Sequence, residues 1–270
     1  VRGWIGIKRY PRFTLQTAAS LFRKKICKTA RNTRDYFGSI MEIAFRLLSA
    51  TSGERRKYWV EKTTSIEIYA NVLFSWYPRA KFIHLIRDPR DNYAAIKAGW
   101  EKEYSRYFDS VERLLQSMMD RGRLGMEFAK LNLKRFGSDR YLIVKYEDLV
   151  SQPKKELVRI CAFLGIPFHP SLLQPTFGGV NWKGNSFENK SFNSISKGNV
   201  NRWRERITEH EAKVLEYYFG PLLQEFGYAQ FYSNSEKQDA VVEHYKWFNF
   251  AQTYSLRVPP PKRQRSGRSF

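Results

Sequence analysis

The sequence predicts an α/β fold in which helices cover both faces of a central parallel sheet. Short apolar segments alternate with amphipathic helical segments along the 270 residues, a pattern typical of such folds. Residues 80–86 are an apolar run that stops abruptly at the charged segment R-D-P-R-D, residues 87–91. This change indicates a buried strand whose carboxyl end opens into a loop and then a helix. Ligands of open α/β sheets bind at that end of the strands.

The first part of the chain alternates helix and strand. The expected helices are residues 14–34, 36–50, 65–76 and 89–99, and the expected strands are residues 58–62 and 80–86. The second helix has an apolar stripe along one side, made of Tyr36, Ile40, Ile43, Ala44 and Leu47. Pro89 suits the first turn of the fourth helix, where no backbone N–H is needed.

The later part continues the alternation. The expected elements are a helix at 111–135, a strand at 141–146, a helix at 153–164, a loop-rich stretch at 172–196 and a helix at 208–226. Gly122 and Gly125 should soften the first helix, and Ser151 and Gly165 should cap the second.

The last expected helix has the clearest signals at its ends. Thr208 is followed three residues later by Glu211, which predicts a capping box, and Gly227 should stop the helix.

The net charge of +21 is concentrated at the two ends. Residues 1–34 hold ten Lys or Arg and residues 257–270 hold five, with no acidic residue in either segment, so the rest carries only +6. We expect a single domain at residues 1–250 and a basic, disordered tail at residues 251–270. The basic ends could make weak contacts with a membrane surface or an anionic polymer.

Composition excludes several classes of protein. Two cysteines cannot form a disulfide framework, and no apolar run approaches the roughly 18 residues that span a membrane. Basic repeats with interleaved aromatic residues do not dominate the chain, so we expect no nucleic-acid partner. We place the protein in the cytoplasm, although a segment before Val1 would hide a signal peptide or an anchor.

The R-D-P-R-D segment has two interpretations. A basic residue at a strand end, beside the start of a helix, is suited to hold an anion such as phosphate. Alternatively, Arg87 and Arg90 pair with Asp88 and Asp91 in a salt-bridge cluster. We favour the anion site.

Five segments resemble, in order, the motifs of the sulfotransferases that use 3′-phosphoadenosine-5′-phosphosulfate. They are Y-W-V-E-K-T-T at 58–64, R-D-P-R-D at 87–91, Y-L-I-V-K-Y-E-D-L at 141–149, W-K-G-N-S at 182–186 and S-K-G-N-V-N-R-W at 196–203. The last two are similar to motifs of the bacterial and Golgi-type branches. The resemblance covers about residues 55–228. It implies a three-layer α/β/α fold of the P-loop type and transfer of a sulfuryl group to an acceptor hydroxyl.

One motif of that family is not found. Its members begin with a P-R-S-G-T-T or K-x-G-T-T loop whose backbone N–H groups cradle the 5′-phosphosulfate. Residues 179–186 have the glycine spacing of a Walker A loop, but Asn185 stands where lysine is required. Either the chain is N-terminally incomplete, which we favour because it starts at Val1, or it is a degenerate member. In both cases we expect residues 1–270 alone to be inactive.

Lys62 is the candidate catalytic residue. The resemblance implies that its ammonium, at the end of a strand, stabilises the bridging oxygen of the leaving 5′-phosphate. The alternative is an ordinary strand-end lysine. Glu61 would face the opposite side of the strand, and Glu42 and Glu54 stand in no recognisable context, so no general base is assigned.

The resemblance also implies a site for the nucleotide. Arg87 is the candidate for the 3′-phosphate. The family has a serine eight positions later, where this chain has Ala95, so Asn92, one turn earlier on the same helical face, is the candidate substitute. Tyr146 matches a tyrosine that lies against the adenine in relatives; the alternative is a core aromatic residue.

Residues 196–203 are expected to complete that site. A loop of small residues that opens a helix is suited to an anion, so Lys197, Gly198 and Arg202 are candidates to close over the 3′-phosphate, while Trp203 should pack inside. The expected donor substrate is 3′-phosphoadenosine-5′-phosphosulfate. We expect no metal, because the four histidines lack ligand spacing.

The acceptor cannot be read from the sequence. Aromatic and basic residues at 100–108 are compatible with a sugar hydroxyl. The alternative function is a non-catalytic or degenerate basic protein of the same fold that binds anionic polymers or nucleotides.

Overall fold

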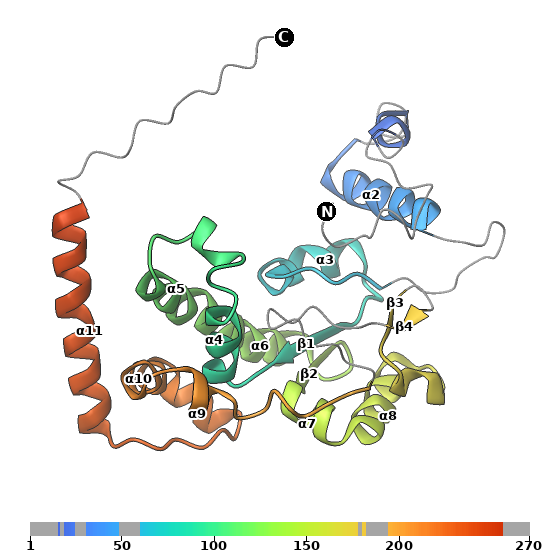
Figure 1. The fold of residues 1–270 in the computed structure, drawn as a ribbon. Helices are drawn as coiled ribbons and strands as arrows, with labels where there is room; N and C mark the ends of the chain where they lie inside the picture. Colours follow the sequence, from blue (N-terminus) through green and yellow to red (C-terminus); the bar gives the residue numbers. More distant parts are fainter. Residues whose placement is uncertain are drawn as a thin grey trace, which may run out of the picture. The chain divides into compact units, whose positions relative to one another are not determined.

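The computed structural model describes residues 16, 19–24, 31–48, 60–177, 180–181 and 194–255. These residues fall into two compact units, one ending at Thr64 and one beginning at Ser65 (Figure 1). The first unit contains helix α2 (Thr33–Leu48), and residues 19–24 are also helical, in agreement with the two helices expected there. All other elements belong to the second unit.

The second unit contains a two-stranded parallel sheet. Strand β1 (Phe82–Ile86) pairs with β2 (Tyr141–Lys145), with Phe82 opposite Tyr141 and Ile86 opposite Lys145. Both strands were predicted, and their parallel pairing puts their carboxyl ends at one edge of the sheet. A short antiparallel pair follows later, β3 (Thr176–Phe177) with β4 (Val180–Asn181).

Two predictions about strands were wrong. Residues 60–62 belong to no strand, and Tyr58 and Trp59 lie outside the described residues. A strand needs a hydrogen-bonded neighbour, and among the described residues β1 pairs with β2 alone. Strand β1 is also not fully buried: Ile83 and Leu85 are exposed on one of its faces, while Ile86, on the other face, is buried.

Helical segments precede and follow β1. In place of one helix at 65–76, a 3₁₀ turn η2 (Ile66–Tyr69) precedes α3 (Ala70–Trp76). The two meet at Tyr69, whose φ of −100° and ψ of 12° depart from α-helical values. After β1, helix α4 (Pro89–Lys97) begins at Asp88, whose carboxylate accepts a hydrogen bond from the backbone N–H of Arg90.

The long helix expected at 111–135 is interrupted as predicted. Helix α5 (Val111–Ser117) leads into a π-helical turn η4 (Met118–Gly122), and α6 (Arg123–Phe136) follows. A short 3₁₀ turn, η3 (Tyr104–Arg106), lies between α4 and α5.

After β2 come α7 (Tyr146–Ser151), α8 (Pro153–Leu164) and the 3₁₀ turn η5 (Pro170–Leu173). Ser151 does not cap α8, because it is the last residue of α7 and its backbone is already helical; Gln152 holds the cap position without a side-chain hydrogen bond. Gly165 ends α8 with φ of 71°, as predicted.

Three helices complete the described chain: α9 (Trp203–Arg206), α10 (Glu209–Glu225) and α11 (Asn234–Ser255). The capping box of Thr208 and Glu211 is confirmed, and Gly227 follows α10 with φ of 68°. Helix α11 was not predicted. It packs on α10 (Figure 1), and it extends into the segment that was expected to be a tail.

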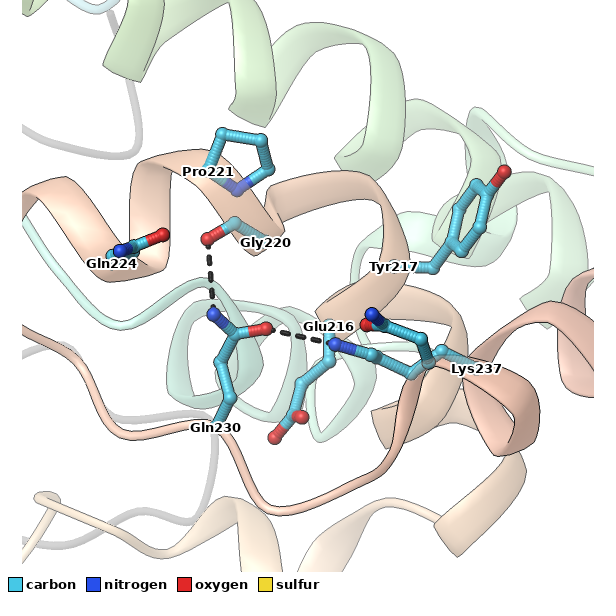
Figure 2. Close-up of a pocket in the computed structure, with 8 residues that line it drawn as sticks. Glu216, Tyr217, Gly220, Pro221, Gln224, Gln230 and Lys237 are labelled. Carbon is cyan, nitrogen blue, oxygen red and sulfur yellow. Dashed lines mark hydrogen bonds between the residues drawn. The ribbon is translucent and has the colours of Figure 1, made fainter.

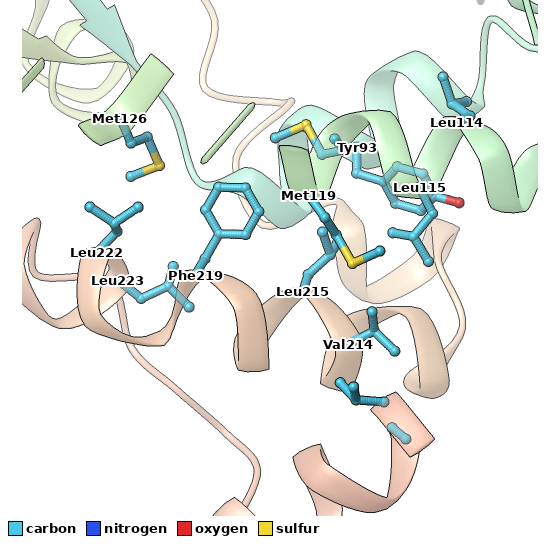
Figure 3. Close-up of a cluster of buried hydrophobic side chains, with 13 residues drawn as sticks. Tyr93, Leu114, Leu115, Met119, Met126, Val214, Leu215, Phe219, Leu222 and Leu223 are labelled. Atoms are coloured by element: carbon cyan, nitrogen blue, oxygen red, sulfur yellow. The ribbon is translucent and has the colours of Figure 1, made fainter. Parts of the chain in front are cut away.

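The main hydrophobic core joins α4, α5, η4, α6, α10 and α11 (Figure 3). Its buried members include Tyr93, Leu114, Leu115, Met119, Met126, Val214, Leu215, Phe219, Leu222 and Leu223. Because Tyr93 belongs to this core, the core fixes α4 and therefore the segment at its start. Among the described helices, none is long and apolar enough to cross a membrane.

Candidate functional site

Arg90 forms a buried charge cluster at the start of α4. Its side chain is 2% exposed and donates hydrogen bonds to Asp88, from Nε to Oδ1 at 3.0 Å and from Nη2 to Oδ2 at 2.6 Å. Nη1 donates to Oε1 of the fully buried Glu216 at 2.5 Å. Burial alone would lower the pKa of Arg90, but the two carboxylates outweigh it and raise the pKa. The salt-bridge interpretation is therefore confirmed for Arg90 and Asp88, and a longer ion pair also joins Arg87 and Asp91.

Arg87, three residues earlier, has different surroundings. Its side chain is 20% exposed, its Nη2 donates to the carbonyl oxygen of Asn199 at 2.6 Å, and Asp91 Oδ2 lies 3.9 Å from Nη2. The guanidinium carbon lies 4.7 Å from the ring centroid of Tyr146. Its Nε is buried and has no hydrogen-bond partner among the described residues. Because the side chain is partly exposed, its guanidinium can still donate to an anion at the strand end.

Asp91 attaches residues 196–203 to α4. Its side chain is 1% exposed and accepts hydrogen bonds from the backbone N–H groups of Asn201, at 2.7 Å, and of Trp203, at 2.8 Å. Trp203 is buried, as expected, with the Arg90 guanidinium 4.6 Å from its ring centroid. Burial raises the pKa of Asp91, although these hydrogen bonds and Arg87 act in the opposite direction.

The structure brings together part of the predicted site. Arg87 contacts both the Tyr146 ring and the carbonyl of Asn199, although Tyr146 is the first residue of α7 and not the last of the strand. The remaining predicted residues occupy the following positions: Lys197 and Gly198 are exposed in the loop, Arg202 is half-buried at the start of α9, Asn92 is exposed on α4, and Ala95 is half-buried on the same helix.

The candidate catalytic residue belongs to the first unit. Lys62 is exposed and lies in the segment 60–63, which has no regular secondary structure. The neighbouring Glu61 accepts a hydrogen bond from the hydroxyl of Thr63. The W-K-G-N-S segment at 182–186 and Glu54 lie outside the described residues.

Glu147 makes two hydrogen bonds that were not predicted from the sequence. Its Oε1 accepts a hydrogen bond from the backbone N–H of Asp88 at 2.9 Å, and its Oε2 accepts one from the Tyr228 hydroxyl at 2.9 Å. Burial and then Glu147 raise the pKa of Tyr228, which stays a donor. Glu147 thus joins the segments that follow β1 and β2. It is part of the Y-E-D segment, but nothing local indicated its partners.

Comparison with known proteins assigns the family. The sequence model of the sulfotransferase family matches residues 9–170, more than half of the chain. The chain belongs to the sulfotransferase family. The prediction of a sulfotransferase-family enzyme is thereby confirmed at the level of the family.

This family member is similar to several named sulfotransferases at low sequence identity. It is 23% identical over 195 residues to omega-hydroxy-beta-dihydromenaquinone-9 sulfotransferase of Mycobacterium bovis, covering 68% of this chain and 45% of the relative. It is 24% identical over 162 residues to carbohydrate sulfotransferase 3 of Tetronarce californica, covering 55% and 36%. It is 26% identical over 172 residues to sulfotransferase 2A2 of Rattus norvegicus, covering 57% and 59%. The chain thus spans about half the length of these relatives.

Solved structures show a similar fold. The sulfotransferase domain from the curacin biosynthetic pathway superposes with a TM-score of 0.55 at 19% identity, covering 83% of this chain and 77% of that domain. The sulfotransferase domain of the Synechococcus PCC 7002 olefin synthase gives 0.53 at 22% identity, covering 83% and 74%. These likenesses, together with the parallel β1–β2 pair, support the predicted α/β class.

A separate cavity of about 310 Å³ lies beside α10 (Figure 2). Its lining consists of Glu216, Tyr217, Gly220, Pro221, Gln224, Gln230, Asn234 and Lys237. Lys237 donates to Gln230 Oε1 at 3.0 Å, and Gln230 Nε2 donates to the Gly220 carbonyl at 3.2 Å. The predicted site residues are not among those that line it, so this cavity is distinct from the strand-end site.

Proposed function

We propose that this family member transfers a sulfuryl group from 3′-phosphoadenosine-5′-phosphosulfate to a hydroxyl of its acceptor, on a three-layer fold of the P-loop type. The observation that carries the proposal is the meeting of Arg87, Tyr146 and Asn199 at the carboxyl ends of the parallel strands. Ligands of α/β sheets bind at that edge.

Each contact has a role in holding the nucleotide. The partly exposed Arg87 donates hydrogen bonds to the ribose 3′-phosphate. The buried Arg90 cannot do so, because its donors are bound to carboxylates. The Tyr146 ring, already beside the guanidinium, offers a surface for the adenine. Lys197, Gly198 and Arg202 lie on the segment that Arg87 contacts through Asn199, from which they close over the same phosphate.

The reaction needs charge stabilisation at the leaving group. The bond between sulfur and the 5′-phosphate oxygen breaks, a bond from sulfur to the acceptor oxygen forms, and the hydroxyl proton passes to a base. Lys62 is the residue proposed to stabilise the bridging oxygen. In a longer form of the protein that carries the phosphosulfate loop, Lys62→Ala should therefore lower kcat, with the KM for the donor less affected.

The acceptor is proposed as a hydroxyl compound, with carbohydrate as the narrower class. Support comes from the aromatic and basic segment at 100–108 and from the relative named carbohydrate sulfotransferase 3. Sulfuryl transfer by a form that carries the phosphosulfate loop, measured with monosaccharide and polysaccharide acceptors and with simple alcohols, tests the narrower class.

Nucleotide binding is the direct test of the proposal. Calorimetry should show that 3′-phosphoadenosine-5′-phosphate binds about tenfold or more tightly than AMP, because a charge-assisted pair supplies roughly 1.5–3 kcal/mol. Equal affinities for the two nucleotides would refute the assignment of Arg87.

A further inference from the structure

We infer that Asp91 is a positioning residue, which holds residues 196–203 against Arg87 and thereby forms the 3′-phosphate site. The inference rests on the proposed function. It concerns the second aspartate of R-D-P-R-D, whose side chain does not reach the strand-end surface and for which the resemblance implied no role.

The contacts of Asp91 require a carboxylate. Its two oxygens each accept one backbone N–H, Oδ2 from Asn201 at 2.7 Å and Oδ1 from Trp203 at 2.8 Å. The side chain is 1% exposed, so water cannot replace either acceptor at little cost. An amide in its place would present one acceptor and one donor to two donors.

The turn that Asp91 holds contains a residue with a left-handed backbone. Asn201 has φ of 61°, a conformation that few residues other than glycine and asparagine adopt. Such conformations persist where surrounding contacts determine them, and they cluster at functional sites. The carboxylate supplies that contact at Asn201 itself and again two residues later at Trp203.

Holding this turn places the loop on Arg87. Asn199 lies two residues before the left-handed Asn201, and its carbonyl accepts the 2.6 Å hydrogen bond from Arg87 Nη2. The same Asp91 oxygen that binds Asn201 lies 3.9 Å from that nitrogen. One buried carboxylate thus sets the distance between the loop that carries Lys197 and the arginine proposed to bind the phosphate.

The test compares Asp91→Asn with a matched control, Glu211→Gln. Glu211 is also buried and also binds α4, through Tyr93 and Lys97, and its remaining partner is Thr208. The readout is the ratio of affinities for 3′-phosphoadenosine-5′-phosphate and AMP in the whole chain. We expect Asp91→Asn to reduce this ratio by roughly tenfold and Glu211→Gln to leave it unchanged.

Trypsin gives a second readout, because Lys197 and Arg202 are cleavage sites within the loop. Asp91→Asn should be cut there faster than both the wild type and Glu211→Gln. If Asp91→Asn keeps the affinity ratio, or if Glu211→Gln loses it equally, the inference is wrong while the proposed function stands. If the wild type shows no preference for the nucleotide with the 3′-phosphate, both the inference and the proposed role of Arg87 are wrong.

A measurement on the wild type decides the matter if Asp91→Asn does not fold. The backbone amides of Asn201 and Trp203 should exchange with solvent at least about tenfold more slowly than that of the exposed Lys197. Equal exchange rates at the three positions would overturn the inference.

Discussion

The strand-end site and the hydrophobic core share helix α4 but are stabilised in different ways. The core side of α4 contributes Tyr93, which packs with residues such as Leu215 and Phe219 in the fully buried cluster of Figure 3. The start of α4 contributes charges, of which Arg90 is enclosed and Arg87 remains partly exposed. The core fixes the position of the helix, and the charged turn leaves one arginine available for binding.

The largest expected effect is in the core. Phe219→Ala should lower the free energy of unfolding by about 3–5 kcal/mol, because the ring is fully buried where α10 packs on η4 and α6. Urea denaturation measures the loss. The folded fraction should keep its preference for the 3′-phosphorylated nucleotide, since the ring does not contact the site. A loss below about 1 kcal/mol would mean that the cluster rearranges to fill the cavity.

Arg90→Met tests the enclosed half of the charged turn. It leaves Asp88 and the fully buried Glu216 without their cation, so the free energy of unfolding should fall by roughly 3 kcal/mol. The same denaturation experiment measures it. An unchanged stability would show that apolar packing replaces the ion pairs at no cost, as happens in some proteins.

Arg87→Ala tests the open half, and it should separate binding from stability. Affinity for 3′-phosphoadenosine-5′-phosphate should fall by about 1.5–3 kcal/mol and that for AMP much less, because only the former carries the 3′-phosphate. The free energy of unfolding should change less than in Arg90→Met, because Arg87 is partly exposed. If both arginine variants destabilise the fold equally and neither alters the nucleotide preference, the division into a structural Arg90 and a binding Arg87 is wrong.

The smallest expected effect depends on pH and concerns the sheet beneath the site. His84 Nδ1 lies 2.6 Å from the Tyr141 hydroxyl, and burial lowers the pKa of His84. A lowered folded-state pKa means that the stabilisation is present above the unfolded value of about 6.5 and is lost as pH falls through the folded one.

The wild type should therefore lose stability between about pH 7.5 and pH 5.5, by at most about 1.4 kcal/mol per pH unit from this one proton. The variant His84→Gln should lose less over the same range in paired denaturation curves. His244, whose pKa burial also lowers, is present in both proteins, so the difference reports His84. Parallel pH profiles would contradict the assignment.

The sequence by itself determined the features that depend on neighbouring residues. Pro89 and the capping box of Thr208 and Glu211 mark helix starts, and Gly165 marks a helix end, through contacts within a few residues. The alternation of apolar segments was sufficient to predict β1 and β2, and the motif order was sufficient to predict the family. These signals are local, so they can be interpreted without knowing how the rest of the chain folds.

Only the tertiary structure decided which arginine of R-D-P-R-D is enclosed by carboxylates and which stays partly exposed. Arg87 and Arg90 have the same chemistry in the sequence, but Arg90 meets Glu216, 126 residues away, and Arg87 meets Asn199, 112 residues away. Helix α11 was missed for a related reason: its buried residues Ala240 and Val241 gain their stability from the core that they join. Partners so distant along the chain are chosen by how the helices pack, and no local pattern contains that information.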